Sequence, residues 1–271
     1  MTTTELALPN DWTAGSPTTP RRPAGQLASA LRSEWIKFTS VRTNKVILAV
    51  AVGLGLLVSW ATATFVTDQD LTVADVYIFP TLLTSVLAAI AGVLLFTSEV
   101  QHGTLAAALA AQPARRAVAV AKALVAGGYG LVLGAAGMTT GLIGALAGGI
   151  ELGDTAGVPT AVLWALLYTT GSGLLGLGVG MVVRHSAGAV SGVLVWWLVV
   201  ESLIIQFAPA EVVHFLPFDS GWRAARGESD FDSPEIVASA LSNPTYATIF
   251  LGYVTAALVA GWVLLHRRDI D

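Results

Sequence analysis

The feature that most constrains the fold is a succession of six apolar runs. The runs cover residues 46–66, 76–98, 123–149, 159–183, 187–208 and 246–265. An α-helix of about 20 apolar residues crosses the roughly 30 Å of hydrocarbon in a bilayer. Only 12% of the 271 residues are charged, whereas a soluble domain carries about 25%. The sequence therefore predicts an all-α, polytopic membrane protein whose six-span domain covers residues 46–268.

The segment before the first run divides into two parts. Residues 1–25 contain four prolines among threonine, glycine and serine, so we expect a disordered cytoplasmic tail. A signal peptide would need an apolar core of about 7 to 15 residues, which this segment lacks. In residues 26–45, Leu31, Trp35 and Phe38 recur at helical spacing, with charged residues on the other faces. This pattern predicts an amphipathic helix in the membrane interface.

A polar connector, residues 99–122, separates the second run from the third. Small residues from Thr104 to Ala111 predict a short helix, because Pro113 follows and proline ends or kinks a helix. Arg115 and Arg116 come next. Two interpretations of this connector remain open, namely a solvated basic loop and a docking surface for another subunit.

The distribution of Lys and Arg predicts the orientation of the chain. Six spans place both termini on one side, and all but two of the 14 Lys and Arg residues then fall in tails and loops on that side. The two exceptions, Arg223 and Arg226, lie in the longest loop, residues 209–245. Basic residues that flank spans are retained on the cytoplasmic face. We therefore expect a multi-pass protein of the cell membrane with both termini cytoplasmic and residues 209–245 extracellular.

The connections around the last three runs predict further details. Residues 184–186 form a very short link, so we expect the fourth and fifth runs to be a tight antiparallel pair. The extracellular loop mixes aromatic and acidic residues, and we expect part of it to enter the outer interface. His214 in this loop is interpreted as an interfacial histidine and not as a metal ligand.

Seven glycines form a continuous stripe along the third run. They are Gly127, Gly130, Gly134, Gly137, Gly141, Gly144 and Gly148. Their alternating intervals of three and four residues place them on one side of a helix. Small residues let helices approach closely in a membrane. We expect a packing seam, centred on the five glycines from Gly130 to Gly144, and the alternative is a substrate path.

Glu201 is the one ionisable residue deep within a run. It lies 14 residues beyond Ala187, about 21 Å from the inner edge of the membrane at 1.5 Å per residue. An unpaired carboxylate there costs several kcal/mol, so it needs protein partners, water or a proton. Arg223 and Arg226 are the candidate partners in an outer loop that folds back. Two roles are open for Glu201, a tie between the fifth run and this loop or a place in the transport path.

Several patterns typical of enzymes are missing from the sequence. Without a GxxxxGK[ST] phosphate-binding loop, the chain is not itself a Walker-type ATPase. It contains no HExxH motif and no cysteine, so neither a zinc protease nor a thiolate site is expected. We therefore predict no catalytic residue, no metal site and no cofactor in this chain.

Two charged motifs flank the first two runs. Arg32-Ser33-Glu34-Trp35-x-Lys37 precedes the first run, and Ser98-Glu99-x-x-His102-Gly103-Thr104 ends the second, followed by Pro113-x-Arg115-Arg116 and Lys122. With the six runs, these motifs resemble the permease subunits of type-2 ABC exporters, most closely the actinobacterial ones. The resemblance covers about residues 26–268, and the connector carries most of it.

The resemblance implies roles for the residues before and after the first two runs. The elbow helix, residues 26–45, would contain Leu31, Trp35, Lys37 and Phe38. The coupling segment, which docks on a separate ATPase, would contain Glu99, His102, Gly103, Thr104, Arg115 and Arg116. ATP and Mg²⁺ would bind to that partner, and a second permease, identical or homologous, would complete a dimer in the lipid bilayer.

The expected function is therefore outward transport of a hydrophobic or amphipathic substrate, such as a drug, a lipid or a lipid-linked molecule. The spans have few hydrogen-bonding positions, which favours such substrates over sugars and ions. Nothing indicates a nucleic-acid partner. Two alternatives stay open, an ion- or proton-coupled carrier and a membrane scaffold or immunity-type protein without transport activity.

Overall fold

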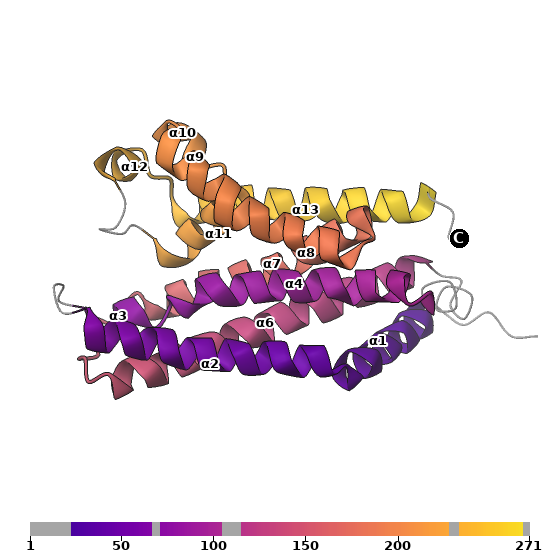
Figure 1. The fold of residues 1–271 in the computed structure, drawn as a ribbon, viewed down its shortest axis with the longest axis horizontal. Coiled ribbons are helices and arrows are strands. Elements are labelled where there is room, and N and C mark those ends of the chain that lie inside the picture. The colour runs from indigo at the N-terminus through magenta and orange to yellow at the C-terminus, as the bar shows by residue number, and fades with distance from the viewer. Residues whose placement is uncertain (1–22, 67–70, 105–114, 228–232, 268–271) are drawn as a thin grey trace, which may run out of the picture.

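The computed structural model describes residues 23–66, 71–104, 115–227 and 233–267, and within them all regular structure is helical (Figure 1). In the first half of the chain the helices are α1 (Pro23–Ser40), α2 (Arg42–Phe65), α3 (Val73–Val76), α4 (Pro80–Gln101) and α6 (Arg115–Ala147). In the second half they are α7 (Val158–Val183), α8 (Ser186–Val195), the π-helix η2 (Trp196–Glu201), α9 (Ser202–Phe207), α10 (Ala210–Val213), α11 (Pro217–Arg226), α12 (Pro234–Ala238) and α13 (Asn243–Arg267).

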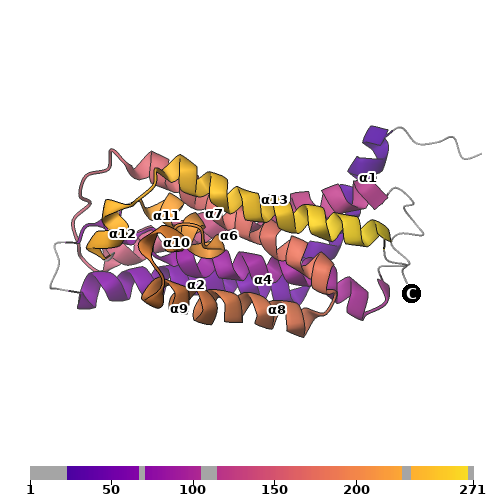
Figure 2. The ribbon, with the colours of Figure 1, turned by 90° about the horizontal axis from the view of Figure 1, so that it is seen from above.

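The prediction of six spans in an all-helical chain is confirmed. Six helical stretches of the described chain are long and apolar enough to cross a membrane. They are α2, α3 with α4, α6, α7, α8 to α9, and α13. The start of α1 and the end of α13 lie at the same end of the bundle (Figures 1 and 2). We call this the inner end, and the opposite end, which carries α3 and α10 to α12, the outer end.

Two helix boundaries differ most from the predicted ones. The interfacial helix was expected over residues 26–45, but α1 ends at Ser40 and the extended backbone of Val41 separates it from α2. The third span was expected to begin at residue 123, but α6 begins at Arg115. The basic residues of the connector therefore stand on the first turns of a helix and not in a loop.

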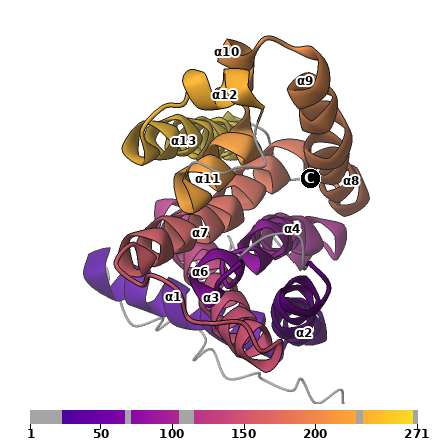
Figure 3. The same ribbon diagram turned by 90° about the vertical axis from the view of Figure 1, so that its left-hand side faces the viewer.

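Helix α7 occupies the centre of the bundle (Figure 3). It packs against α4, α6, α11 and α13, and Tyr168 and Leu177 on it are fully buried. Glycines allow these close contacts, because a Cβ atom at Gly176 would collide with the carbonyl oxygen of Ala89 on α4. The near-continuous apolar sequence of α7 follows from this central position, since a helix surrounded by protein has no polar face.

The glycine stripe of α6 contacts three helices in succession. At Gly130 and Gly134 an added Cβ would meet Thr169 of α7. At Gly137 it would lie 2.6 Å from Thr84 Cγ2 of α4, and at Gly144 it would meet the carbonyl oxygen of Leu56 of α2. Gly141 lies between these last two sites, against the backbone at Tyr77 and the side chain of Ser59. The stripe thus lies in protein contacts along most of its length.

The fourth and fifth spans do not form the expected tight pair along their length. The turn between them is short, and Arg184 caps α7 in a left-handed conformation. Beyond it, α8 packs mainly on α4, and α9 leans away from the bundle (Figure 1). Ser186 Oγ lies 2.7 Å from Thr97 Oγ1 and 2.8 Å from Gln101 Oε1, which fixes the start of α8 to the end of α4.

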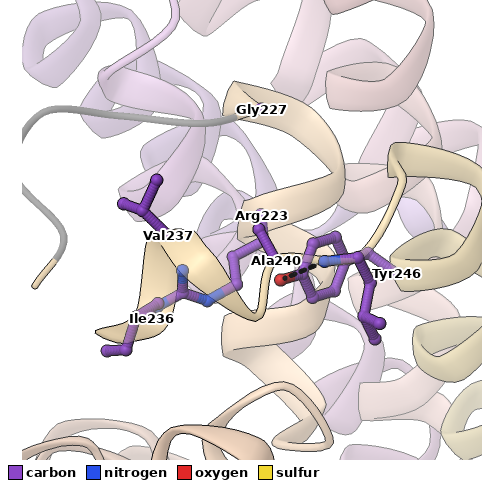
Figure 4. A pocket seen from close by; sticks show the side chains of 7 residues that line it. Arg223, Gly227, Ile236, Val237, Ala240 and Tyr246 are labelled. Atoms are coloured by element: carbon purple, nitrogen blue, oxygen red, sulfur yellow. Dashed lines mark hydrogen bonds between the residues drawn. The ribbon is translucent and has the colours of Figure 1, made fainter. Parts of the chain in front are cut away.

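The outer segment folds back onto the bundle. Helix α11 packs between α7 and α13 and buries Phe218 in the main core cluster. His214, interpreted from the sequence as interfacial, is instead buried, with Nδ1 2.8 Å from the Tyr246 hydroxyl and Nε2 2.9 Å from Ser239 Oγ. The Tyr246 hydroxyl also accepts a hydrogen bond from the Leu241 N–H, beside a small pocket that Arg223 lines (Figure 4).

Candidate functional site

Four charged residues from three helices meet at the inner end of the bundle. Glu34 and Lys37 come from α1, Glu99 from the last turn of α4 and Lys122 from the first turns of α6. Lys122 Nζ lies 2.7 Å from Glu34 Oε2 and 2.8 Å from Glu99 Oε2. Lys37 Nζ lies 3.0 Å from Glu34 Oε1 and 3.0 Å from Glu99 Oε1. We call this closed ring of alternating charges the charge cluster.

The charge cluster is buried on one side and open on the other. The side chain of Lys122 is 2% exposed and that of Lys37 is 42% exposed. The side chains of Glu34 and Glu99 are 4% and 11% exposed, so both carboxylates are largely buried. Each buried ion costs several kcal/mol in lost solvation, and only well-placed opposite charges offset this cost. Because two cations alternate with two anions, the cluster is neutral as a whole. Loss of Lys122 would leave two carboxylates with one half-exposed partner.

The open side of the cluster stays charged at neutral pH. Partial burial disfavours the ammonium form of Lys37, but hydrogen bonds to Glu34 and Glu99 outweigh it and raise the pKa of Lys37 above its usual value. Because that value is already near 10.4, the contribution of Lys37 to stability is complete at neutral pH. It would be lost only at strongly alkaline pH, as the pH rises through the raised pKa.

The sequence of α1 places Glu34 in the cluster. Ala30, Glu34 and Phe38 are spaced by four residues, so they share one face of the helix, and all three are buried. This face packs on α6, where the Phe38 ring meets Tyr129 edge-on at 4.5 Å between centroids. The Tyr129 hydroxyl donates to the carbonyl of Asn44, just after the break between α1 and α2. Helix α1 is therefore held across α6 at both its charged and its aromatic contacts.

The exposed side of α1 carries several large apolar side chains. Trp35 is 53% exposed, and Leu31 and Ile36 beside it are exposed as well. Large apolar side chains at the end of a membrane bundle are typical of an interfacial helix, where tryptophan lies at the level of the headgroups. The assignment of this helix as an elbow helix stays a prediction.

The predicted coupling residues lie at the two ends of residues 105–114. On the α4 side, His102 caps the helix, Gly103 adopts a left-handed conformation with φ of 67°, and the Thr104 hydroxyl donates to the carbonyl of Glu99 at 3.3 Å. On the α6 side, Arg115 begins the helix and Arg116 is exposed. The short helix predicted from Thr104 to Ala111 falls, beyond Thr104, outside the described residues. Glu99 and Lys122 thus place the charge cluster beside both ends of this segment.

Comparison with known families decides the class of protein. The model of the ABC-2 family transporter proteins matches residues 61–270. The chain belongs to the ABC-2 transporter family. No curated protein matches it. Members of this family are membrane components of transporters and imply a partner subunit that binds ATP. The closer resemblance to actinobacterial permeases stays a prediction.

In this ABC-2 protein, Glu201 holds the outer segment to the fifth span. Its Oε1 accepts hydrogen bonds from the Phe218 N–H and from Trp196 Nε1, and its Oε2 accepts one from the Asp219 N–H, each at 2.9 Å. Phe218 and Asp219 form the first turn of α11, where free N–H groups favour an anion. Arg223, a predicted partner of Glu201, lies 2.5 Å from Asp219 Oδ2.

Glu201 also borders a pocket of about 210 Å³ between the fifth span, α4 and α11. Trp197, Phe218 and Trp222 contribute the aromatic part of its wall. The hydrogen bonds agree with the role of a tie between the fifth span and the outer loop. A role of Glu201 in the transport path stays a prediction.

The ion pair between Glu34 and Lys122, the most buried contact of the charge cluster, was not predicted from the sequence. Glu34 and Lys122 are 88 residues apart, and the sequence pattern alone predicts Glu34 as one of several charges on the polar faces of an interfacial helix. Its spacing from Ala30 and Phe38 was the available signal, since an acid in line with apolar residues indicates a buried position. Among the described residues, no group of three or more His, Asp and Glu is arranged to hold a metal ion.

Proposed function

We propose that this ABC-2 protein is the permease subunit of an ATP-driven exporter, and that the charge cluster transmits the movement of the ATPase to the spans. The observation that carries the proposal is the position of the cluster. It joins α1, α4 and α6 beside the two ends of residues 105–114, the segment proposed to dock on the ATPase.

The mechanism follows from how these helices are connected. Helix α4 leads into the docking segment and α6 leads out of it, so a displacement of this segment pulls on both helices. Lys122 links Glu99 of α4 to Glu34 of α1, and breaking either contact would leave this buried cation with one carboxylate partner in place of two. The three helices therefore move as one body. The glycine contacts of α6 pass this movement on to α7 and α2.

The remaining parts of the proposal concern the surroundings of the chain. ATP and Mg²⁺ bind to the partner ATPase, a second permease completes the dimer, and the inner end faces the cytoplasm of a cell whose plasma membrane holds the complex. An outward-moving hydrophobic or amphipathic substrate is supported by an apolar pocket of about 400 Å³ in the outer half of the bundle, between α3, α6 and α7. Tyr77, Met138 and Val162 are among its lining residues.

The proposal is tested with the permease co-expressed with an ATP-binding-cassette ATPase that co-purifies with it. Lys122→Met should abolish the effect of the permease on ATP hydrolysis, because α1 and α4 lose their buried link. Lys37→Met, the same change at the half-exposed lysine, should leave that effect nearly intact. The measurement is the hydrolysis rate of the complex relative to that of the ATPase alone.

Misfolding of Lys122→Met is separated from uncoupling by a double variant. Glu34→Gln with Lys122→Met removes one charge of each sign, and neutral replacement of a buried ion pair is often tolerated. We expect this variant to fold, as judged by a monodisperse elution profile, but to remain uncoupled. Normal folding together with wild-type coupling would show that the cluster is not the link.

A further inference from the structure

A groove of about 300 Å³ runs along the inner half of the bundle between α6 and α13. These two helices both pack on α7 but scarcely touch each other, so α7 forms the floor of the groove. The residues that line it are Arg116, Ala119, Val120 and Ala123 of α6, Met181 of α7, and Leu258 and Trp262 of α13.

The groove matches one leaflet of a membrane in depth and polarity. Arg116 stands at its inner mouth, and Ala123 lies seven residues further along α6, about 10 Å away at 1.5 Å per residue. Half of a bilayer's hydrocarbon core is roughly 15 Å thick. Apart from Arg116, every lining side chain is apolar. Val120 is 47% exposed, so the groove opens sideways to the surrounding lipid and not only at its mouth.

The helices around the groove carry positive charge at their inner ends and no negative charge. Arg116 on α6, Arg184 at the end of α7 and Arg267 at the end of α13 lie at the inner end. Along the described lengths of these three helices there is no Asp or Glu. Arg184 also donates to the carbonyl of Leu264, which joins the ends of α7 and α13. Asp269 and Asp271 of the C-terminal tail lie outside the described residues.

We infer that this groove binds an anionic glycerophospholipid of the leaflet at the inner end. Its phosphate lies at Arg116, because guanidinium groups bind phosphate through paired hydrogen bonds. One acyl chain lies along Val120 and Ala123 over Met181, and Trp262 flanks it, as tryptophan does near the interface. Basic pockets between spans at the cytoplasmic side suit anionic headgroups. The lipid bridges α6 and α13, which the protein itself leaves almost unconnected.

The headgroup part of the inference is tested by lipid retention. The purified permease is stripped of lipid, given equal amounts of phosphatidylglycerol and phosphatidylcholine, and analysed by native mass spectrometry. We expect phosphatidylglycerol to be retained several-fold more than phosphatidylcholine. Arg116→Gln should reduce this preference several-fold, whereas Arg42→Gln, an exposed arginine at the same end of the bundle but outside the groove, should leave it unchanged.

The acyl-chain part is tested by filling the groove. Val120→Trp places a large ring in it, and Leu124→Trp places the same ring on an exposed position of α6 that does not line it. Only Val120→Trp should lose the bound phosphatidylglycerol, with an unchanged elution profile for both. Equal retention of the two lipids, equal effects of the two arginine changes, or full retention by Val120→Trp would each overturn the inference.

Discussion

Gly144 lies at a contact of α6 with α2 that leaves no room for a side chain. A Cβ atom there would collide with the carbonyl oxygen of Leu56 and lie 3.0 Å from the amide nitrogen of Trp60. Both are backbone atoms, so neither can rotate away as a side chain does. The contact is therefore available to glycine alone.

The first prediction compares two glycines of the same helix. Gly144→Ala should lower the thermal stability of the detergent-solubilised protein, since overpacking costs about 1–3 kcal/mol. Gly128 has no atom within 4 Å of an added Cβ, and Gly128→Ala should be neutral or stabilising by up to about 1 kcal/mol through helix propensity. Melting temperatures from fluorescence-detected size exclusion distinguish the two. Equal melting temperatures would mean that α2 and α6 do not depend on close approach.

The roles of some residues can be predicted from the sequence, and those of others cannot. The spacing of the glycines predicted that they lie on one side of a helix. It did not indicate which helices pack against that side. The pairing of Glu34 with Lys122 was beyond the sequence for a related reason. Each charge has a reasonable solvated position in its own segment, and only the packing of α1 across α6 brings them together.

At the scale of elements, the attachment of α11 to η2 depends on the side chain of Glu201. Glu201 Oε2 accepts from the Asp219 N–H, and Oε1 accepts from Phe218 and Trp196. A glutamine cannot accept all three bonds, because its amide nitrogen is a donor. At least one buried N–H group then loses its partner, which costs about 1–3 kcal/mol.

The second prediction is that Glu201→Gln loosens α11. Ser220 on this helix is fully buried, and the chain has no cysteine, so Ser220→Cys gives a clean reporter of opening. In the Glu201→Gln background, this thiol should react with a maleimide roughly tenfold faster, as expected for a loss of about 1.4 kcal/mol. Glu211→Gln removes an exposed carboxylate at the same end and should not change the rate. An unchanged rate in Glu201→Gln would show that contacts other than those of Glu201 hold α11 in place.

The sequence predicted which segments are helical better than it predicted how they begin, end and pack. Hydropathy marks the part of a helix that lies in hydrocarbon, whereas backbone hydrogen bonds carry the helix further, as in α6 from Arg115. The fifth span shows the limit for packing. Its short link to α7 predicted a tight pair, but the polar contacts of Ser186 draw α8 towards α4.

For the molecule as a whole, the six-span, all-helical class was predictable because the bilayer imposes it. Spans must satisfy their backbone hydrogen bonds internally and reach a length of about 20 residues. Both conditions can be recognised in an amino-acid sequence. The family match over residues 61–270 agrees with this architecture. The central place of α7 was not foreseen, although its near-continuous apolar sequence is what such a position requires.

The most direct test is to locate the part of this chain that an ATPase contacts. A photo-crosslinking amino acid is placed at Thr104, at the inner end, or at Asp154, an exposed residue at the outer end. The permease is co-expressed with an ATP-binding-cassette ATPase that co-purifies with it. The account predicts a crosslinked permease–ATPase product from Thr104 and none from Asp154. A product from Asp154 alone, or none from either position in correctly folded protein, would contradict it.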